Sequence, residues 1–254
     1  MSRSLKSALA SILPVLIIRK DRFASLNQEK IDLFDFAWRK FGIKSFADLG
    51  GVWKVDGGYT FYALYNYPIE RALLVDTDFT EKVFQRAGSF PALKLIQGNF
   101  GSEEVAQKIG SVDAVMFFDT LLHQVDPDWD QVLEMYAWRA KYFLIFNQQF
   151  TASETTVRLL DLPEDEYFNN VEVDKKQDPY KELYRRLSEI HLQHKRPYRD
   201  IHNIWQWGIT DVDLIAKMKG LGFELQSYKN VGTFGGWKNF ENHAFVFSRR
   251  AMTK

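Results

Sequence analysis

The sequence contains no cysteine, and this absence excludes three kinds of chemistry. Without thiols there is no disulfide framework, no thiolate nucleophile and no zinc site built on cysteine. A reducing compartment is the simplest setting for such a chain, and we expect the protein in the cytoplasm. Proline is also scarce, at 7 residues in 254, and no proline-rich or serine-rich linker divides the chain. We therefore expect a single domain spanning residues 1–254.

An excess of charge of one sign is missing as well. Lysine plus arginine number 33, and aspartate plus glutamate also number 33, so no net field attracts nucleic acid or an anionic membrane. The longest apolar run, Ala8 to Ile18, is interrupted by Pro14 and is too short to span a bilayer. No small-residue cleavage site follows it, so we interpret it as a packing helix or arm, with a membrane-surface or partner contact as the alternative. We expect no transmembrane segment and no DNA partner.

The sequence does contain a regular alternation of strand-like and helix-like patterns. Several short runs are apolar on both faces, as buried parallel strands require, and segments with apolar residues every three or four positions separate them. The last two strands have the pattern of an antiparallel closing pair. We predict an α/β fold, a doubly wound, mostly parallel seven-stranded sheet with helices on both faces and an antiparallel closing strand. The expected strands are 45–50, 71–78, 93–100, 112–120, 141–150, 223–232 and 243–250, and the expected helices are 27–42, 59–67, 79–88, 102–110, 129–140 and 210–223.

A polar and aromatic segment, residues 151–205, interrupts this alternation. Residues 162–180 have the composition of a loop or short hairpin, and residues 180–194 that of a polar helix. His191 and His194 would share one solvated face of that helix, and without cysteine we expect no zinc there. Because the segment begins directly after the fifth strand, we interpret it as a substrate cap inserted into the domain, which a helical arm, residues 1–44, precedes. A helical hairpin that serves a homodimer is the alternative.

The first expected strand ends in an unusual way. Its sequence FADLGG places Asp48, Gly50 and Gly51 at the end of a buried strand, where glycine lets a ligand approach the backbone. A dinucleotide-binding fingerprint requires Gly-x-Gly-x-x-Gly, but Val52 and Lys54 stand where further glycines belong. The chain also lacks the Tyr-x-x-x-Lys pair of short-chain dehydrogenases. Hydride transfer is therefore the weaker interpretation.

The order of the motifs resembles the class I S-adenosylmethionine-dependent methyltransferase family over approximately residues 46–249. FADLGG is similar to the first motif of that family, LLVDTD to the second, LIQGNF to the third and VDAVMFFDTLLHQV to the fourth. The resemblance implies S-adenosylmethionine as the cofactor, with Asp76 on the ribose hydroxyls and Asn99 and Phe100 near the adenine. The longer first loop, which contains KVDGG, would gain flexibility from Gly57 and Gly58. The resemblance implies these cofactor contacts: Asp48, Gly50, Gly51, Asp76, Thr77, Asn99, Phe100, Asp119 and Thr120.

Methyl transfer from a sulfonium depends mainly on alignment, and a general base helps when the acceptor must lose a proton. His123, a few residues after the fourth strand, is the candidate catalytic base, and a histidine bonded inside a helix start is the alternative. Asp119 and Asn147 are similar to positions of metal-binding catechol-type members. Gln148 stands where those members need a further carboxylate, so we expect no metal.

Aromatic side chains on and beside the predicted cap are the candidate substrate contacts, namely Tyr184, Trp205 and Trp207. We expect a small-molecule or sugar acceptor, methylated at oxygen. One alternative is a tRNA-modifying enzyme, because IWQWGITDVDLIAKMKGLGF is similar to the ending of tRNA wobble-uridine carboxymethyltransferases. Its basic face would be RRLSEIHLQHKRPYR, but the neutral chain argues against RNA. The other alternative is a non-catalytic protein of the same fold, in which the altered glycine loop marks lost cofactor binding.

Overall fold

The computed structural model describes residues 23–250, so the apolar run at residues 8–18 and the first half of the predicted arm lie outside the described residues. A seven-stranded sheet forms the centre, in the order β3-β2-β1-β4-β5-β9-β8. β1 to β5 are parallel, and β9 is antiparallel to both β5 and β8. This confirms the predicted sheet with its antiparallel closing strand. The strands are β1 (Ser45–Leu49), β2 (Arg71–Asp76), β3 (Leu93–Gln97), β4 (Val112–Phe118), β5 (Ala140–Phe150), β8 (Phe223–Thr233) and β9 (Phe240–Arg249).

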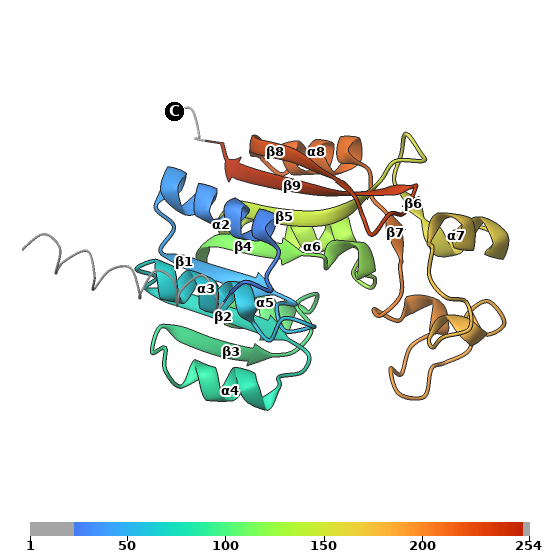
Figure 1. Cartoon of the computed structure of the whole chain (residues 1–254), viewed down its shortest axis with the longest axis horizontal. Coiled ribbons are helices and arrows are strands. Elements are labelled where there is room, and N and C mark those ends of the chain that lie inside the picture. The colour runs from blue at the N-terminus through green and yellow to red at the C-terminus, as the bar shows by residue number, and fades with distance from the viewer. Residues whose placement is uncertain (1–22, 251–254) are drawn as a thin grey trace, which may run out of the picture.

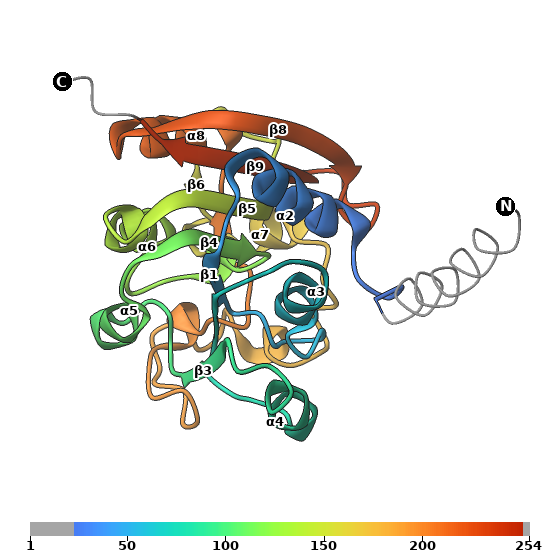
Figure 2. The same ribbon diagram turned by 90° about the vertical axis from the view of Figure 1, so that its left-hand side faces the viewer.

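Helices cover both faces of this sheet, as Figure 2 shows. One face is covered by α2 (Gln28–Phe41), α3 (Gly58–Asn66) and α4 (Glu81–Ala87), and the other by α5 (Glu103–Ile109), α6 (Trp129–Ala137) and α8 (Asp211–Gly220). Within residues 23–250 no helix is long and apolar enough to cross a membrane.

Side-chain caps explain why these helices begin where they do. The Asn27 side chain accepts hydrogen bonds from the first backbone amides of α2, and Gly42 ends that helix at a φ of 62°. Thr80, Ser102 and Thr210 cap α4, α5 and α8 in the same way. A cap of this kind stabilises a helix by about 1 kcal/mol, so the helix boundaries are encoded locally.

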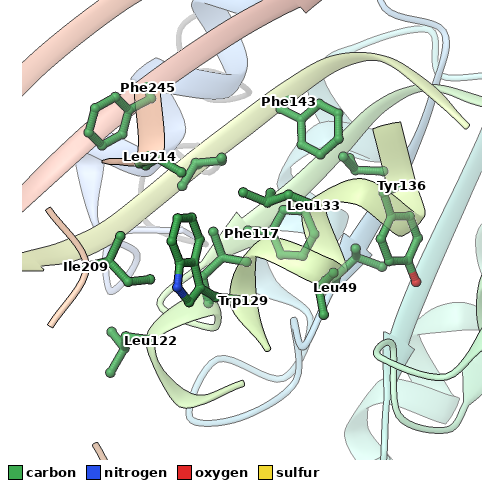
Figure 3. Close-up of a cluster of buried hydrophobic side chains, with 14 of the residues drawn as sticks. Leu49, Phe117, Leu122, Trp129, Leu133, Tyr136, Phe143, Ile209, Leu214 and Phe245 are labelled. Carbon is green, nitrogen blue, oxygen red and sulfur yellow. The ribbon is translucent and has the colours of Figure 1, made fainter. Parts of the chain in front are cut away.

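The larger core lies between the sheet and the helices α5, α6 and α8 (Figure 3). Phe117 of β4 packs edge-on against Tyr136 of α6 and stacks parallel to Phe143 of β5, with centroids 5.9 and 6.2 Å apart. All three side chains are fully buried. Burial of an aromatic side chain of this size stabilises the fold by about 1.5–3 kcal/mol, so β4 and β5 are held firmly against α6.

The carboxyl ends of β1 to β5 form one edge of the sheet, which we call the carboxyl edge. In Figure 1 the arrowheads of the parallel strands point toward the side where residues 151–205 lie. Open α/β sheets bind their ligands at this edge, because the loops that follow the strands converge there.

The segment 151–205, which we call the insertion, leaves β5 and returns through β7 (Trp207–Gly208). β7 pairs with β6 (Val157–Arg158) in a two-stranded ribbon. The insertion contains the helix α7 (Glu164–Asn170), so the expectation of a loop or hairpin over residues 162–180 was wrong for these residues, while residues 171–179 are irregular as expected. Three carboxylates occupy the first turn of α7, where the helix dipole favours negative charge.

The predicted helix at residues 180–194 is also wrong. Only a single 3₁₀ turn forms, at Tyr180–Glu182, and the chain then continues irregularly. Ile190 and Leu192 are exposed by 55% and 79%, so the second half of this segment has no buried apolar stripe. A short helix without such a stripe is marginal in water, because tertiary packing supplies most of its stability. His191 and His194 consequently lie ring to ring across a turn, with centroids 4.6 Å apart.

Candidate active site

The end of β1 holds a buried carboxylate against a glycine. Thr60 Oγ1 donates a hydrogen bond of 2.7 Å to Asp48, and burial raises the pKa of Asp48 to about 6. A Cβ atom on Gly51 would lie 2.5 Å from Asp48 Cγ, closer than real Cβ atoms approach any atom. Only glycine therefore lets the backbone pass over this carboxylate.

Three of the sequence motifs meet at Gly50. Gly50 has a φ of 78°, and a Cβ atom there would lie 2.7 Å from Thr120 Cγ2 and 3.4 Å from Phe100 Cε1. Thr120 Oγ1 is buried, and no hydrogen-bond partner is seen for it among residues 23–250. The loops after β1, β3 and β4 thus form a close-fitting cradle with an unused hydroxyl group.

Asp76 ends β2 and ties the first loop to that strand. Its Oδ2 accepts a 2.9 Å hydrogen bond from the Val52 amide, and its Oδ1 accepts one of 2.8 Å from the Thr77 amide. Thr77 Oγ1 also donates to Oδ1, over a long 3.4 Å. Because each carboxylate oxygen has two acceptor sites, Oδ2 keeps capacity for one further donor, and Oδ1 gains it when the Thr77 hydroxyl turns away. Asp76 can therefore still accept from two neighbouring hydroxyl groups.

The loop between Gly51 and α3 is a closed turn rather than a flexible extension. The amides of Val55 and Asp56 both donate to Val52 O, at 3.1 and 2.8 Å, and Gly57 N donates to Gly51 O at 3.0 Å. Gly57 adopts a φ of 69°, and a Cβ there would lie 2.7 Å from Leu74 Cδ2. Gly57 and the buried Gly58 thus fit a tight backbone path into α3, which differs from the flexibility expected of them.

The turn after β3 is shaped by Asn99 and Phe100. Asn99 Oδ1 accepts a 2.8 Å hydrogen bond from the Gly101 amide, and Tyr136 OH donates to Phe100 O at 2.8 Å. The Asn99 side chain therefore forms the turn itself, while the Phe100 ring lies beside Gly50.

Asp119, just beyond β4, is held by two side chains from different elements. It has a φ of 58°, forms an ion pair with Lys30 of α2, and accepts a 2.7 Å hydrogen bond from Gln148 of β5. Lys30 is only 7% exposed, and its ammonium lies 4.8 Å from the centroid of the Phe146 ring. Lys30 was not predicted as a site residue from the sequence. Its spacing could have indicated it, because Lys30 stands four residues before Phe34 and so falls on the buried face of α2.

His123 ends a 3₁₀ turn, Leu121–His123, that follows β4. Its Nδ1 lies 2.7 Å from Ile204 O, and a carbonyl oxygen only accepts, so Nδ1 carries the proton. Nε2 of the neutral ring then holds a free lone pair. Burial lowers the pKa of His123, which keeps the ring neutral near pH 7, while the Ile204 carbonyl and the Asp119 carboxylate oppose that shift.

The return of the insertion packs against the segment that carries His123. Trp205 lies edge-on to His123, with centroids 5.8 Å apart, and Trp207 Nε1 donates a 2.8 Å hydrogen bond to Gln124 O. Tyr184 lies elsewhere, because its OH bonds to Leu162 O at 3.1 Å and its ring packs inside the insertion. The structure therefore brings Trp205 and Trp207 beside His123, and it does not bring Tyr184 there.

Solved structures with the same arrangement of strands and helices define the class of fold. The N-terminal domain of EvdMO1, solved with SAH bound, aligns with a TM-score of 0.53 and 13% identity over 87% of this chain and 81% of that chain. The 1,6-didemethyltoxoflavin-N1-methyltransferase of Burkholderia thailandensis, solved with 1,6-didemethyltoxoflavin and S-adenosylhomocysteine, aligns with a TM-score of 0.53 and 9% identity over 93% and 89% of the two chains. TnmH aligns with a TM-score of 0.52 and 13% identity over 97% of this chain and 60% of that chain.

At these identities the similarity establishes the fold, and this chain has the class I methyltransferase fold. No protein-family model matches the sequence, and no curated protein matches it at the level of sequence.

Proposed function

We propose that this protein transfers a methyl group from S-adenosylmethionine to a small-molecule acceptor. The observation that carries the proposal is the cradle at Gly50 and Gly51, because a side chain at Gly50 would collide with Thr120 of the fourth motif and one at Gly51 with Asp48 of the first motif. Three carboxylates, those of Asp48, Asp76 and Asp119, follow or end adjacent parallel strands around this cradle. A cofactor with a sulfonium and an ammonium group suits such an acidic edge.

The residues present fit this cofactor, which supplies an electrophilic methyl group when bound. Asp76 would accept from the two ribose hydroxyls, and the backbone at Gly50 and Gly51 would meet the amino-acid part. Phe100, beside Gly50, offers a flat apolar surface for the adenine. Thr120 Oγ1, buried and without a partner among the described residues, is available to the ligand.

His123 would serve as the general base for a hydroxyl acceptor. The bond from Nδ1 to Ile204 O leaves Nε2 unprotonated, and the lowered pKa keeps it so near neutral pH. Oxygen methylation fits this arrangement, since a hydroxyl group must lose its proton to act as the nucleophile, whereas an acceptor atom that carries no proton needs no base.

The arginines of the basic stretch in the insertion already pair with carboxylates, and this favours a small acceptor over RNA. Four of its arginines lie within 4 Å of a carboxylate, in the pairs Arg185–Glu182, Arg186–Glu189, Arg196–Asp126 and Arg199–Asp161. A polyanion would have to displace these carboxylates before it gained phosphate contacts. The basic stretch is therefore a poor surface for RNA.

The insertion would act as a cap over the acceptor. Its end is anchored to the segment after β4 through Ile204 O on His123 and through the hydrogen bond from Gln206 N to Leu122 O, at 3.2 Å. A cap should become protected from a protease when the pocket fills. Cleavage of residues 151–205 that is unchanged by S-adenosylhomocysteine together with candidate acceptors would contradict this role.

The direct test is transfer of a labelled methyl group. Purified protein is incubated with S-adenosylmethionine labelled in its methyl group and, separately, with phenols, sugars and total tRNA. We expect label in a phenol or sugar and none in tRNA. Label in tRNA alone would support the alternative enzyme class, and binding of S-adenosylhomocysteine without transfer to any acceptor would support the non-catalytic alternative.

A further inference from the structure

The first loop carries an exposed pair of residues, Trp53 and Lys54, and Lys54 stands where a further glycine was expected. Trp53 is 72% exposed, and the ammonium of Lys54 lies 4.1 Å from the centroid of its ring. Both residues come two and three positions after Gly51, in the loop that leaves the end of β1, so they lie at the carboxyl edge beside the cradle. A large aromatic side chain in this position has no role in the cofactor contacts proposed above.

The backbone of this loop is strained in a way that holds the pair in place. Lys54 has a φ of 62°, which a lysine adopts at a cost of about 1 kcal/mol or more, and Asp56 has a φ of 47°, which aspartate tolerates better. Asp56 fixes the turn from outside, since it accepts a 2.8 Å hydrogen bond from Thr80 Oγ1 and lies 3.5 Å from Lys82. Strain that neighbouring contacts maintain is typical of functional loops.

The charge of Lys54 has no carboxylate partner among residues 23–250, whereas the carboxylates around it do have partners. Asp119 is paired with Lys30, Asp56 with Lys82, and Asp76 accepts from backbone amides. The Lys54 ammonium is close enough to His123 to oppose protonation of its ring. An unpaired positive charge therefore lies beside the exposed Trp53 ring and within electrostatic reach of the candidate base.

We propose that Trp53 and Lys54 form the acceptor subsite, and that it takes an anionic acceptor with a flat apolar face, the ring of Trp53 stacking on that face and Lys54 pairing with the anion. Two kinds of molecule offer this chemistry, an aromatic carboxylic acid and a sugar acid. The proposal rests on the proposed function only in calling the bound molecule the acceptor, because binding at the subsite can be measured without methyl transfer.

The test uses fluorine NMR on full-length protein labelled with 5-fluorotryptophan. The chain has 7 tryptophans, and the signal missing from Trp53→Phe identifies Trp53. The probes are 4-hydroxybenzoate and glucuronate, each compared with its neutral counterpart, 4-hydroxybenzyl alcohol or glucose. We expect the Trp53 signal to move with at least one acid at lower concentration than with its neutral counterpart, and which acid succeeds separates the two sources.

Lys54→Asn removes the charge while keeping a residue that tolerates positive φ. It should weaken binding of the acid by roughly two- to fivefold, the range of an exposed ion pair, and leave the neutral probe unchanged. Trp53→Ala, in which binding is followed through the proton signals of the probe itself, should weaken both by roughly three- to tenfold. Trp138, 65% exposed with the Arg139 guanidinium 3.7 Å from its ring, is the matched control at the far end of α6, and Trp138→Ala should change neither.

Two results would overturn the subsite. One is a Trp53 signal that no probe moves at millimolar concentration, and the other is an equal preference for the acid in wild type and Lys54→Asn. Affinity for S-adenosylhomocysteine, measured in the same variants, should stay within twofold of wild type. If the probes bind at Trp53 but S-adenosylhomocysteine does not bind anywhere, the proposed function fails while the subsite stands.

Discussion

Lys30 and Asp119, separated by 89 positions in the sequence, form an ion pair that joins the first turn of α2 to the end of β4. The lysine is almost fully buried and lies within 6.0 Å of the ring centroids of Tyr59, Phe118 and Phe146. The side chain of Asp119 is 37% exposed, so one partner is enclosed while the other faces the carboxyl edge. This contact makes α2 part of the candidate site.

Replacement of Lys30 by methionine should therefore destabilise the protein more than loss of a surface pair does. Methionine keeps the packing among the rings but leaves Asp119 without its cation, and we expect a loss of about 1–3 kcal/mol in the free energy of unfolding in urea. Lys44→Met is the control, because Lys44 and Glu70 are both more than 60% exposed and their pair should contribute less than about 1 kcal/mol. Equal losses of unfolding free energy in the two variants would show that the buried Lys30 pair contributes no more than an exposed pair.

Gly51→Ala should remove cofactor binding and destabilise the fold. The new methyl group would collide with the Asp48 carboxylate, and overlap of this kind typically costs about 1–3 kcal/mol. Gly220→Ala, in the last turn of α8, is the control, since nothing lies within 4 Å of its Cβ position and alanine should be neutral or slightly stabilising there. A Gly51→Ala protein with wild-type melting temperature and affinity would contradict the close approach at this position.

Asp48 should make stability depend on pH. Its folded pKa of about 6 lies above the unfolded value of 3.8, so the folded protein holds the proton more tightly. Stability therefore falls as pH rises from about 4 to about 6, and above pH 6 the penalty is complete, at about 3 kcal/mol. Asp48→Asn should be more stable than wild type at pH 8, with the difference shrinking toward pH 4, when melting temperatures are compared across pH. The same variant should also bind cofactor more weakly. A difference in melting temperature that does not change with pH would refute the raised pKa of Asp48.

His123→Gln should lower turnover without changing cofactor affinity. Loss of a general base typically reduces the rate by about a hundredfold to ten-thousandfold, while the dissociation constant of S-adenosylhomocysteine should stay within twofold of wild type. Because the pKa of His123 is lowered, the wild-type rate should be flat near pH 7 and decline only below pH 6.5. His202→Gln is the control, since His202 also bonds to the segment after β4, at Val125 O, 3.0 Å away. Equal losses in both variants would mean that His123 only holds the insertion in place.

The strands and most helices could be predicted because their signals are local. Asn27, Thr80, Ser102 and Thr210 cap helices through their own side chains, and the parallel strands inside the sheet are mostly buried and apolar, with β3 at the edge as the exception. The grouping of residues around Gly50 and Gly51 could likewise be predicted. Each of them ends or follows a strand, and the alternation of strands and helices indicates that these strands are parallel and end at the same edge.

What could not be predicted depends on contacts between distant segments. The stretch at residues 180–194 has helical spacing, but its tyrosines pack on Tyr167 and Phe168 of α7 instead. Lys30 belongs to the site only because Asp119 meets it across the sheet edge, and no spacing rule links the two residues. The backbone angle of Lys54 is set by hydrogen bonds around Val52, so the sequence showed only that a glycine was missing there.

The most direct test of a cofactor site at the carboxyl edge is calorimetric titration of the purified protein with S-adenosylhomocysteine and, in parallel, with nicotinamide cofactors. We predict saturable one-to-one binding of the first and none of the second. Asp76→Ala should weaken that binding by at least about tenfold, since hydrogen bonds to a charged group are worth about 1.5–3 kcal/mol each, while Asp78→Ala, which changes an exposed neighbour, should not. Folded wild-type protein that shows no saturable binding of S-adenosylhomocysteine or S-adenosylmethionine would contradict the proposed function outright.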